Sequence, residues 1–219
     1  MRVYYFAKAC WALEDIEKRR LKVSRFSDLN DPFELMGGEL RDEASRSRFG
    51  KWARRIDLRC GLLCFSPTWK NPLMWSHYGD KHKGMCLGFD VRDDMLKKVV
   101  YSTERLLHDA NSASNGIPRT EEMKERLLTT KFEGWKYEDE RRVIVPLKEA
   151  LFDGKHHFRQ FDEDLRLAQV FAGARCAETE TRIYQAIERL PGRIEVIKAR
   201  LAFKSFRVVK NQLGFGTLQ

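Results

Sequence analysis

The chain has 219 residues, of which 42% are apolar and 33% are charged, and these values indicate a folded globular protein. Forty-one Lys and Arg residues against 32 Asp and Glu residues give a net charge of +9, which favours polyanionic partners such as DNA or RNA. No apolar run reaches the roughly eighteen residues of a membrane span, and the five cysteines include no CxxC pair. The sequence therefore argues against a membrane protein and predicts a cytoplasmic protein with reduced thiols.

The hydrophobic pattern predicts strands and helices that follow one another without a regular alternation. The predicted strands cover residues 3–6, 21–24, 61–65, 85–89, 97–101, 141–147, 170–172, 195–199 and 202–209. The predicted helices cover residues 8–19, 41–59, a short segment from Pro72, a segment capped by Thr120, and 178–190. We therefore predict one α+β domain over residues 1–219 with mixed and antiparallel sheets, comprising a core of about 3–145 and a C-terminal strand–helix–strand portion over 168–210.

The predicted helix over residues 41–59 is amphipathic, with one apolar and one basic stripe. Phe49, Trp52 and Ile56 form the apolar stripe, whereas the basic one contains Arg48, Lys51 and Arg55. The three cations are candidate nucleic-acid ligands, and the alternative is a solvated charged face.

The segment Asn30-Asp31-Pro32-Phe33-Glu34 is rich in turn-forming residues, and proline disfavours a helical conformation in the residue before it. We predict an ordered loop here. Either Asn30 and Asp31 contact a ligand, or the segment is an Asx-type turn with Phe33 in the core.

The run over residues 64–90 mixes large aromatic residues with titratable ones at a strand–turn–helix–strand junction, where binding and catalytic residues tend to gather. His77, Asp80 and His82, with Glu138 or Glu140, also allow a metal-dependent nuclease as an alternative. Their spacing matches neither HExxH nor a zinc finger, so no metal is expected.

Glu138 and Glu140 precede an apolar strand and are flanked by Trp135 and Tyr137. A carboxylate at the exposed start of a strand can hold a ribose hydroxyl or stabilise a developing positive charge. The alternative is a solvated cluster with internal Glu–Arg pairs.

These segments together resemble a bacterial family, domain-of-unknown-function family 2971, in which a related group is associated with abortive phage resistance. The resemblance is carried by VYYF, SRFSDLNDPFE, GLLCFSPTWKNPLMWSHYGDKHKGMCLGFD and KFEGWKYEDERRV, from about Val3 to Val145, and VFAGARC fits the usual tail. It implies phage defence or a toxin–antitoxin system, with a toxin, antitoxin or phage-derived partner.

A second resemblance, carried by fewer residues, is to NAD-dependent ADP-ribosyltransferases that modify DNA. The strand Cys64-Phe65-Ser66, leading into a Pro-containing segment, is similar to theirs, whereas Tyr4-Tyr5 stands where most of them have Arg or His. The resemblance implies an ADP-ribosyltransferase-like fold, NAD as substrate, and Glu138 or Glu140 with His77 as catalytic residues. The implied NAD-binding residues are Tyr4, Tyr5, Asn30, Asp31, Phe65, Ser66, Trp75 and Tyr78.

Two main hypotheses of function follow. The first is an NAD-dependent ADP-ribosyltransferase-like enzyme whose target is nucleic acid. The second is a non-enzymatic protein that binds nucleic acid or a protein partner in a defence system, as an antitoxin does, and the charge of +9 supports it.

Overall fold

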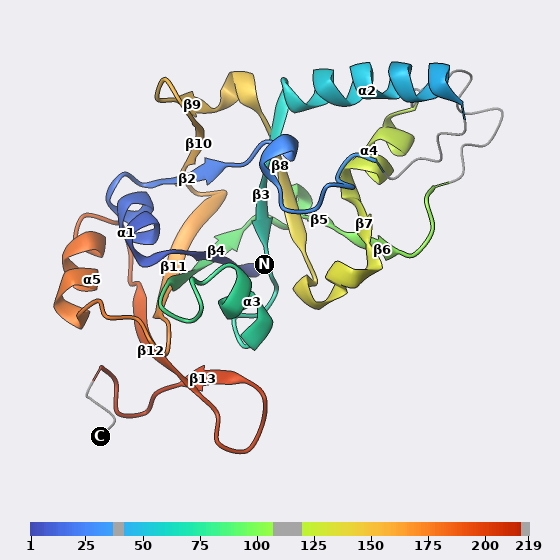
Figure 1. Ribbon diagram of the computed structural model, residues 1–219. Coiled ribbons are helices and arrows are strands. Elements are labelled where there is room, and N and C mark those ends of the chain that lie inside the picture. The colour runs from blue at the N-terminus through green and yellow to red at the C-terminus, as the bar shows by residue number, and fades with distance from the viewer. Residues whose placement is uncertain (37–41, 107–119, 216–219) are drawn as a thin grey trace. The chain divides into compact units, whose positions relative to one another are not determined.

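The computed structural model describes residues 1–36, 42–106 and 120–215 (Figure 1), and it confirms an α+β fold with mixed and antiparallel sheets. The α-helices are α1 (Ala9–Glu17), α2 (Glu43–Asp57), α3 (Pro72–His77), α4 (Glu121–Thr129) and α5 (Glu180–Ile187). Four 3-10 helices accompany them: η1 (Phe26–Asp28), η2 (Asp93–Met95), η3 (Glu133–Glu138) and η4 (Leu147–Glu149). The strands are β1 (Arg2–Ala7), β2 (Arg20–Val23), β3 (Cys60–Phe65), β4 (Met85–Val91), β5 (Lys97–Lys98), β6 (Val100–Ser102), β7 (Thr130–Phe132), β8 (Arg141–Pro146), β9 (Leu151–Phe152), β10 (His157–Gln160), β11 (Leu165–Ala172), β12 (Glu195–Leu201) and β13 (Val208–Lys210).

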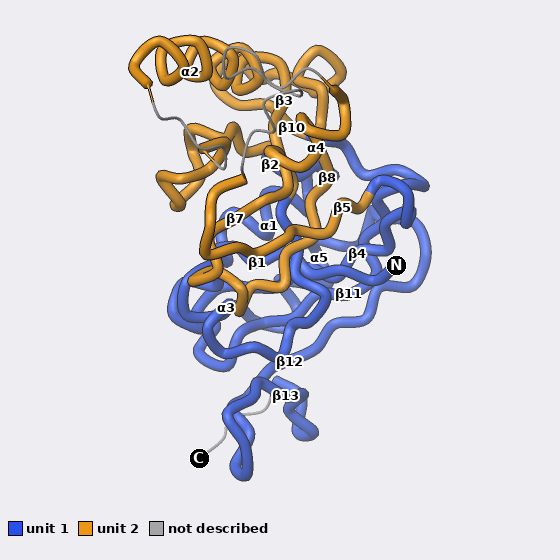
Figure 2. Tube along the Cα trace, turned by 90° about the vertical axis from the view of Figure 1, so that its right-hand side faces the viewer, with its two compact units in different colours: residues 1–22, 64–95, 159–219 blue, residues 23–63, 96–158 orange. Residues whose placement is uncertain are grey.

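The chain divides into two compact units, each built from separate stretches of sequence (Figure 2). Unit 1 contains residues 1–22, 64–95 and 159–219, and unit 2 contains residues 23–63 and 96–158. The prediction of one continuous domain over residues 1–219 stays a prediction, and each unit is described by itself below.

Unit 1 is built on a five-stranded sheet in the order β1-β4-β11-β12-β13. The pairs β1–β4, β4–β11 and β12–β13 are antiparallel, whereas β11 and β12 are parallel, with α5 between them in sequence. Helices α1 and α5 lie side by side (Figure 1), and an ion pair of 2.5 Å joins Glu17 to Arg182. Leu13 and Ile16 of α1 and Ile183 of α5 are buried. Most residues of the strands β4 and β11 are also buried and belong to this apolar core.

Unit 2 contains the sheet β3-β8-β5, to which β3 contributes its first four residues, and the parallel pair β6–β7. Helix α2 buries its apolar stripe against α4, and the contact consists of Phe49 and Trp52 with Met123 and Leu127. Asp42 caps α2 by accepting a hydrogen bond from the Ser45 backbone N–H, 2.8 Å away. Thr120 caps α4 in the same way, as predicted, through the N–H of Met123 at 3.1 Å.

Two predicted strands are not continuous in the structure. The strand predicted over residues 202–209 is shortened to β13, because the Ala202 N–H donates to the Arg207 carbonyl at 2.9 Å and closes a loop. The strand predicted over residues 97–101 is divided, because β5 pairs with β8 whereas β6 pairs with β7.

Candidate functional site

A cluster of buried charged side chains lies in the interior of unit 2. It brings together the NDPFE and KFEGWKYEDERRV motifs, which are about a hundred residues apart in sequence. The cluster consists of three carboxylates and two cations, Glu34, Glu138, Glu140, Lys131 and Arg142, and therefore carries a formal charge of −1.

Arg142 is the centre of this charge cluster, and its side chain has no solvent-exposed surface. Its Nη1 and Nη2 atoms donate to the two carboxylate oxygens of Glu34, at 3.0 and 2.5 Å. Its Nε and Nη2 atoms donate to both oxygens of Glu140, at 2.8 and 3.1 Å, and Nη1 also donates to the Leu128 carbonyl at 2.8 Å. These contacts match all five N–H donors of a guanidinium, so burial leaves none of them without a partner.

Lys131 is the second cation of the charge cluster. Its Nζ donates to Glu138 at 2.7 Å and to Glu140 at 3.2 Å, and it lies 3.7 Å from a Glu34 oxygen and 5.1 Å from the centre of the Trp135 ring. The neighbouring carboxylates raise the pKa of Lys131 although burial opposes them, so the ammonium stays charged. Burial raises the pKa of Glu34, against the effect of Arg142.

Local backbone structure holds these side chains in place. Asp31 accepts a hydrogen bond from the Phe33 N–H at 2.9 Å, which is the predicted Asx-type turn, and the turn directs Glu34 inward. Asp139 adopts a left-handed conformation with φ of 44° after η3, and this bend places Glu138 beside Glu140. Tyr101 of β6 accepts a hydrogen bond from the Glu140 N–H at 2.8 Å, and burial raises the pKa of this Tyr to about 12.

The predicted exposure of Glu138 and Glu140 is wrong, because each is only 3% exposed. Both carboxylates are engaged by Lys131, and Glu140 also by Arg142, so neither lies at an open strand start where a ribose would be held. The solvated alternative is wrong for the same reason, although the internal Glu–Arg pair that it assumed is present. Their catalytic role stays a prediction.

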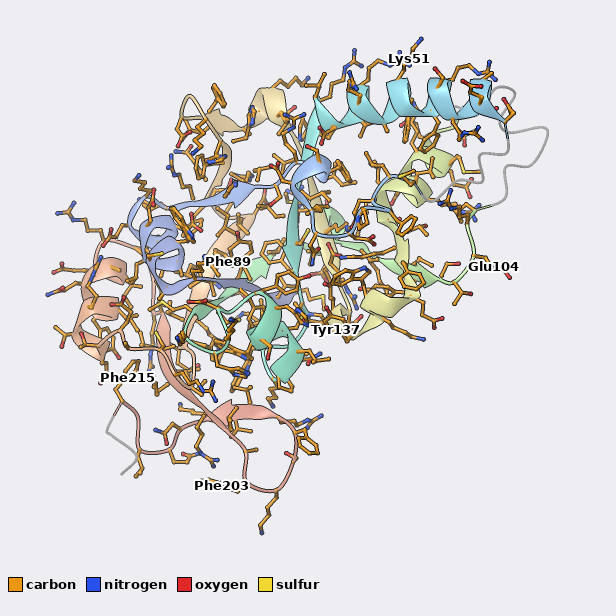
Figure 3. The ribbon with its side chains drawn as sticks, viewed as in Figure 1. Lys51, Phe89, Glu104, Tyr137, Phe203 and Phe215 are labelled. Carbon is orange, nitrogen blue, oxygen red and sulfur yellow. The ribbon has the colours of Figure 1, made fainter. Side chains whose placement is uncertain are left out.

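A pocket of about 370 Å³ adjoins the charge cluster in unit 2, and Lys131 belongs to both. Three exposed apolar side chains line it, Phe33, Met36 and Phe132. The Arg105 guanidinium lies 5.7 Å from the centre of the Phe33 ring. Phe33 is therefore part of this wall, and its predicted place in the core is wrong. The other lining residues are Ser102, Thr103, Glu104 and Thr130, and Figure 3 shows Glu104 at the outer side of unit 2.

The remaining ligand candidates of the NDPFE motif flank this wall. Asn30 is exposed, whereas Asp31 is buried. One carboxylate oxygen of Asp31 accepts the Phe33 N–H, and the other is buried without a hydrogen-bond partner among the described residues. The two predicted NAD contacts Asn30 and Asp31 thus lie in unit 2 with the pocket.

The other predicted NAD-binding residues lie in unit 1, and several of them form its core. Trp75 and Phe65 are almost completely buried, and the Trp75 indole N–H donates to the Trp69 carbonyl at 2.6 Å. The Trp75 ring packs edge-on against Phe6, with centres 5.2 Å apart. A ring enclosed in this way has no open face for nicotinamide, so the geometry gives Trp75 a packing role.

The N-terminal tyrosines pack on the same sheet of unit 1. Tyr5 contacts Phe65 edge-on, and burial raises the pKa of its hydroxyl. Tyr4 lies edge-on to Phe171, with centres 5.8 Å apart, and pairs through its backbone with Ser66. Ser66 is itself buried.

The segment after α3 contains three consecutive residues in the left-handed conformation, Asp80, Lys81 and His82, with φ of 47°, 54° and 70°. This conformation is costly for residues other than glycine. Backbone hydrogen bonds support it: the His82 carbonyl accepts from the Arg175 N–H at 2.9 Å, and the Gly84 carbonyl accepts from Gly173 at 3.0 Å. The GDKHKG and VFAGARC motifs therefore interlock within unit 1.

The histidines of this turn differ in environment. His77 is exposed at the end of α3, next to the half-buried Tyr78. His82 stacks on Trp75 with an interplanar angle of 12°, and burial lowers its pKa. No group of three or more His, Cys, Asp or Glu side chains that could hold a metal ion occurs within residues 1–36, 42–106 and 120–215.

The predicted nucleic-acid ligands lie on α2 in unit 2. Lys51, labelled in Figure 3, and Arg55 are exposed, and Arg48 is half-buried. The helix adds Arg46 and Arg54 to this basic surface, whereas its apolar stripe is buried against α4. Contact with nucleic acid stays a prediction. Across the part of the chain that is described, no helix is long and apolar enough to cross a membrane.

Sequence reasoning missed several residues of the site. Lys131 and Phe132 begin the KFEGWKYEDERRV motif. The sequence does not indicate that Lys131 is buried and Phe132 is exposed. Arg105 follows a polar stretch without periodicity, and no pattern in the sequence signals it.

Comparison with known proteins gives one family. Residues 74–143 match the profile of DUF2971, described as a protein of unknown function. No curated protein and no solved structure matches the chain significantly, and the resemblance to ADP-ribosyltransferases is not shown. The matched segment contains both the left-handed turn of unit 1 and the Lys131–Arg142 part of the charge cluster. The predicted resemblance to the DUF2971 family is confirmed over residues 74–143.

Proposed function

We propose that unit 2 binds a nucleotide in the pocket formed by Phe33, Met36, Arg105 and Phe132. The observation that carries this proposal is the grouping of three exposed apolar side chains and an arginine around one cavity of about 370 Å³. A cavity of this size, lined by aromatic residues and a few polar groups, is typical of small-molecule sites.

The aromatic walls suit a planar base. Phe33 and Phe132 offer ring surfaces to the pocket, and Met36 adds a polarisable thioether that adapts to an aromatic ligand. Stacking of a base on an aromatic side chain is worth about 1–3 kcal/mol and tolerates different bases. The pocket therefore favours nucleotides as a class.

The charges favour an anionic ligand. Arg105 reaches the pocket beside the Phe33 ring, and a guanidinium can bind phosphate oxygens in a bidentate way. Glu104 is the acidic residue of the lining, and its side chain could accept hydrogen bonds from a ribose or an amino group. Lys131 joins the pocket to the charge cluster, in which every donor of Arg142 is satisfied.

Calorimetric titration of the full chain with AMP, ADP-ribose, NAD and nicotinamide tests this proposal. We expect Phe33→Ala and Arg105→Ala each to weaken nucleotide binding about tenfold. Phe152→Ala is the matched control for the ring, because Phe152 is similarly exposed in unit 2 but does not line the pocket. Arg126→Ala, on the exposed face of α4, is the control for the charge. Binding that both pocket variants leave unchanged, or no binding of any nucleotide, would overturn the proposal.

NAD is the nucleotide that the ADP-ribosyltransferase resemblance predicts, and its turnover is a separate proposal. Nicotinamide release should be followed in the same samples with and without DNA or RNA. Loss of release in Glu138→Gln supports a catalytic role only when circular dichroism shows that the variant is fully folded at the assay temperature, since Glu138 also holds Lys131 in the charge cluster. A role in phage defence with a toxin, antitoxin or phage-derived partner rests on the family resemblance alone.

A further inference from the structure

The loop between β12 and β13 in unit 1 exposes aromatic and basic side chains side by side. Its sequence from Leu201 to Arg207 is LAFKSFR. Phe203 is 85% exposed and Phe206 is 98% exposed, the two highest values among the large apolar residues described. Figure 3 shows Phe203 on this projecting loop, and Figure 2 shows the hairpin extending from the rest of unit 1.

The base of the hairpin is firmly held, so the exposed rings are presented on an ordered support. Val208 is completely buried, and its N–H donates to the Lys70 carbonyl at 2.9 Å. Strands β12 and β13 pair in register from Ala199 with Lys210 to Leu201 with Val208. The loop itself is closed by the Ala202 N–H bonding to the Arg207 carbonyl. Two phenylalanines exposed on an ordered hairpin lower the solubility of the protein and add nothing to its core. Exposed apolar groups of this kind indicate a surface that binds a partner.

The charges around the rings indicate which partner fits. Lys204 lies between the two phenylalanines and Arg207 follows the second, and both are exposed. Arg200 adds a guanidinium 4.6 Å from the centre of the Phe203 ring. Glu195, the acidic residue of β12, lies at the opposite end of that strand from the loop. The loop therefore offers stacking surfaces and positive charge with no carboxylate in the segment 196–210.

We propose that the β12–β13 loop binds single-stranded nucleic acid, with bases stacking on Phe203 and Phe206 and phosphates contacting Lys204 and Arg207. Alternating aromatic and cationic side chains are the arrangement by which proteins hold single strands without reading sequence. An anionic membrane suits the loop less well, because insertion of both rings would carry the Lys204 ammonium, which stands between them, toward the apolar layer. The loop belongs to unit 1, whereas the proposed nucleotide pocket belongs to unit 2.

Fluorescence anisotropy with labelled twelve-nucleotide single-stranded DNA and RNA tests the proposal on the full chain. Phe206→Ala should weaken binding about tenfold, and Phe203→Ala/Phe206→Ala more, with the melting temperature unchanged because both side chains are exposed. Lys204→Gln/Arg207→Gln should lower the slope of log affinity against log salt concentration by about 1.4, from about 0.7 for each phosphate contact on a single strand. The controls in unit 2 are Phe152→Ala for the rings and Lys148→Gln for the charge, both at exposed positions.

Three results would overturn the proposal. The first is oligonucleotide affinity that the two phenylalanine variants leave unchanged. The second is affinity that depends only on α2, so that Arg48→Gln/Lys51→Gln/Arg55→Gln abolishes binding while the loop variants do not alter it. The third is co-sedimentation with phosphatidylglycerol vesicles that requires Phe206, without single-strand binding. Competition by AMP, which occupies the unit 2 pocket, separates this proposal from the nucleotide site, because it should not displace the oligonucleotide.

Discussion

The charge cluster of unit 2 predicts that loss of a cation is much more destabilising than loss of a carboxylate. With three carboxylates against two cations, the cluster has a formal charge of −1. Lys131→Met changes this charge to −2 and removes hydrogen bonds of 2.7 and 3.2 Å, whereas Glu138→Gln changes it to zero. Removal of one partner from a buried ion pair typically costs about 3–5 kcal/mol, because the remaining charge stays buried.

We therefore expect Lys131→Met to lower the free energy of unfolding by about 3–5 kcal/mol, and Glu138→Gln by about 1–2 kcal/mol. The double variant restores the charge of −1, so its cost should be smaller than the sum of the single costs by about 1–3 kcal/mol. Lowering the pH from 7.5 to 5 should reduce the deficit of Lys131→Met. Protonation of one of the three carboxylates returns the formal charge of the cluster from −2 to −1, so the stability of this variant relative to the wild type should rise as the pH falls.

Urea denaturation of the four proteins, followed by circular dichroism, measures these differences. Lys136→Met is the matched control, because Lys136 is an exposed lysine of the same segment and its change should stay within about 0.5 kcal/mol. The reasoning would be refuted if Glu138→Gln were the more destabilising change, or if the single effects simply added.

Two other predictions use simple stability measurements. Gly84→Ala should lower the melting temperature sharply, because the new Cβ would lie 2.2 Å from the Ala7 carbonyl oxygen. The control is Gly50→Ala in α2, whose new Cβ meets nothing within 4 Å and should stabilise the protein by about 0.5–1 kcal/mol. Equal effects of the two changes would contradict this account. Burial, reinforced by Glu14 and opposed by Arg20 and Lys18, raises the pKa of Asp15 to about 7 from 3.8. The folded state then binds the Asp15 proton more tightly than the unfolded state does. The resulting contribution of Asp15 to the free energy of unfolding is fully present below about pH 4 and is lost as the pH rises through 7. Asp15→Asn should match the wild type near pH 4 and be more stable at pH 8, by at most about 4 kcal/mol, whereas parallel denaturation profiles over this range would exclude the raised pKa.

The elements that sequence predicted best are those with a clear hydrophobic period. Phe49, Trp52 and Ile56 recur at helical spacing, and α2 buries this stripe as expected. The apolar residues within 202–209 also predict a strand, but Phe203 and Phe206 are exposed in a loop. The sequence shows which residues are apolar, but it does not show whether a neighbouring element covers them. The strand predicted over residues 202–209 is therefore longer than β13.

The charge cluster shows a second limit of sequence reasoning. The sequence predicts Glu138 and Glu140 to be members of a charged cluster with internal Glu–Arg pairs, yet a short stretch of charges looks the same whether it is solvated or buried. What decides burial is Glu34, 108 positions from Arg142, together with Lys131. The NDPFE motif was identified as an ordered loop, and its Asx-type turn is confirmed. The turn also brings Glu34 into contact with Arg142. This contact is long-range, and local sequence spacing does not reveal it.

The discontinuous division of the chain has a consequence for the order in which it folds during synthesis. Unit 2 is complete once residue 158 has emerged from the ribosome, whereas unit 1 still requires residues 159–219. Strand β4 is the second strand of the unit 1 sheet, and its neighbour β11 is translated later. The nascent chain therefore carries β4, which is buried along nearly its whole length in the finished protein, with one edge unpaired until β11 follows. That interval is the period in which the chain most needs protection from aggregation by a chaperone.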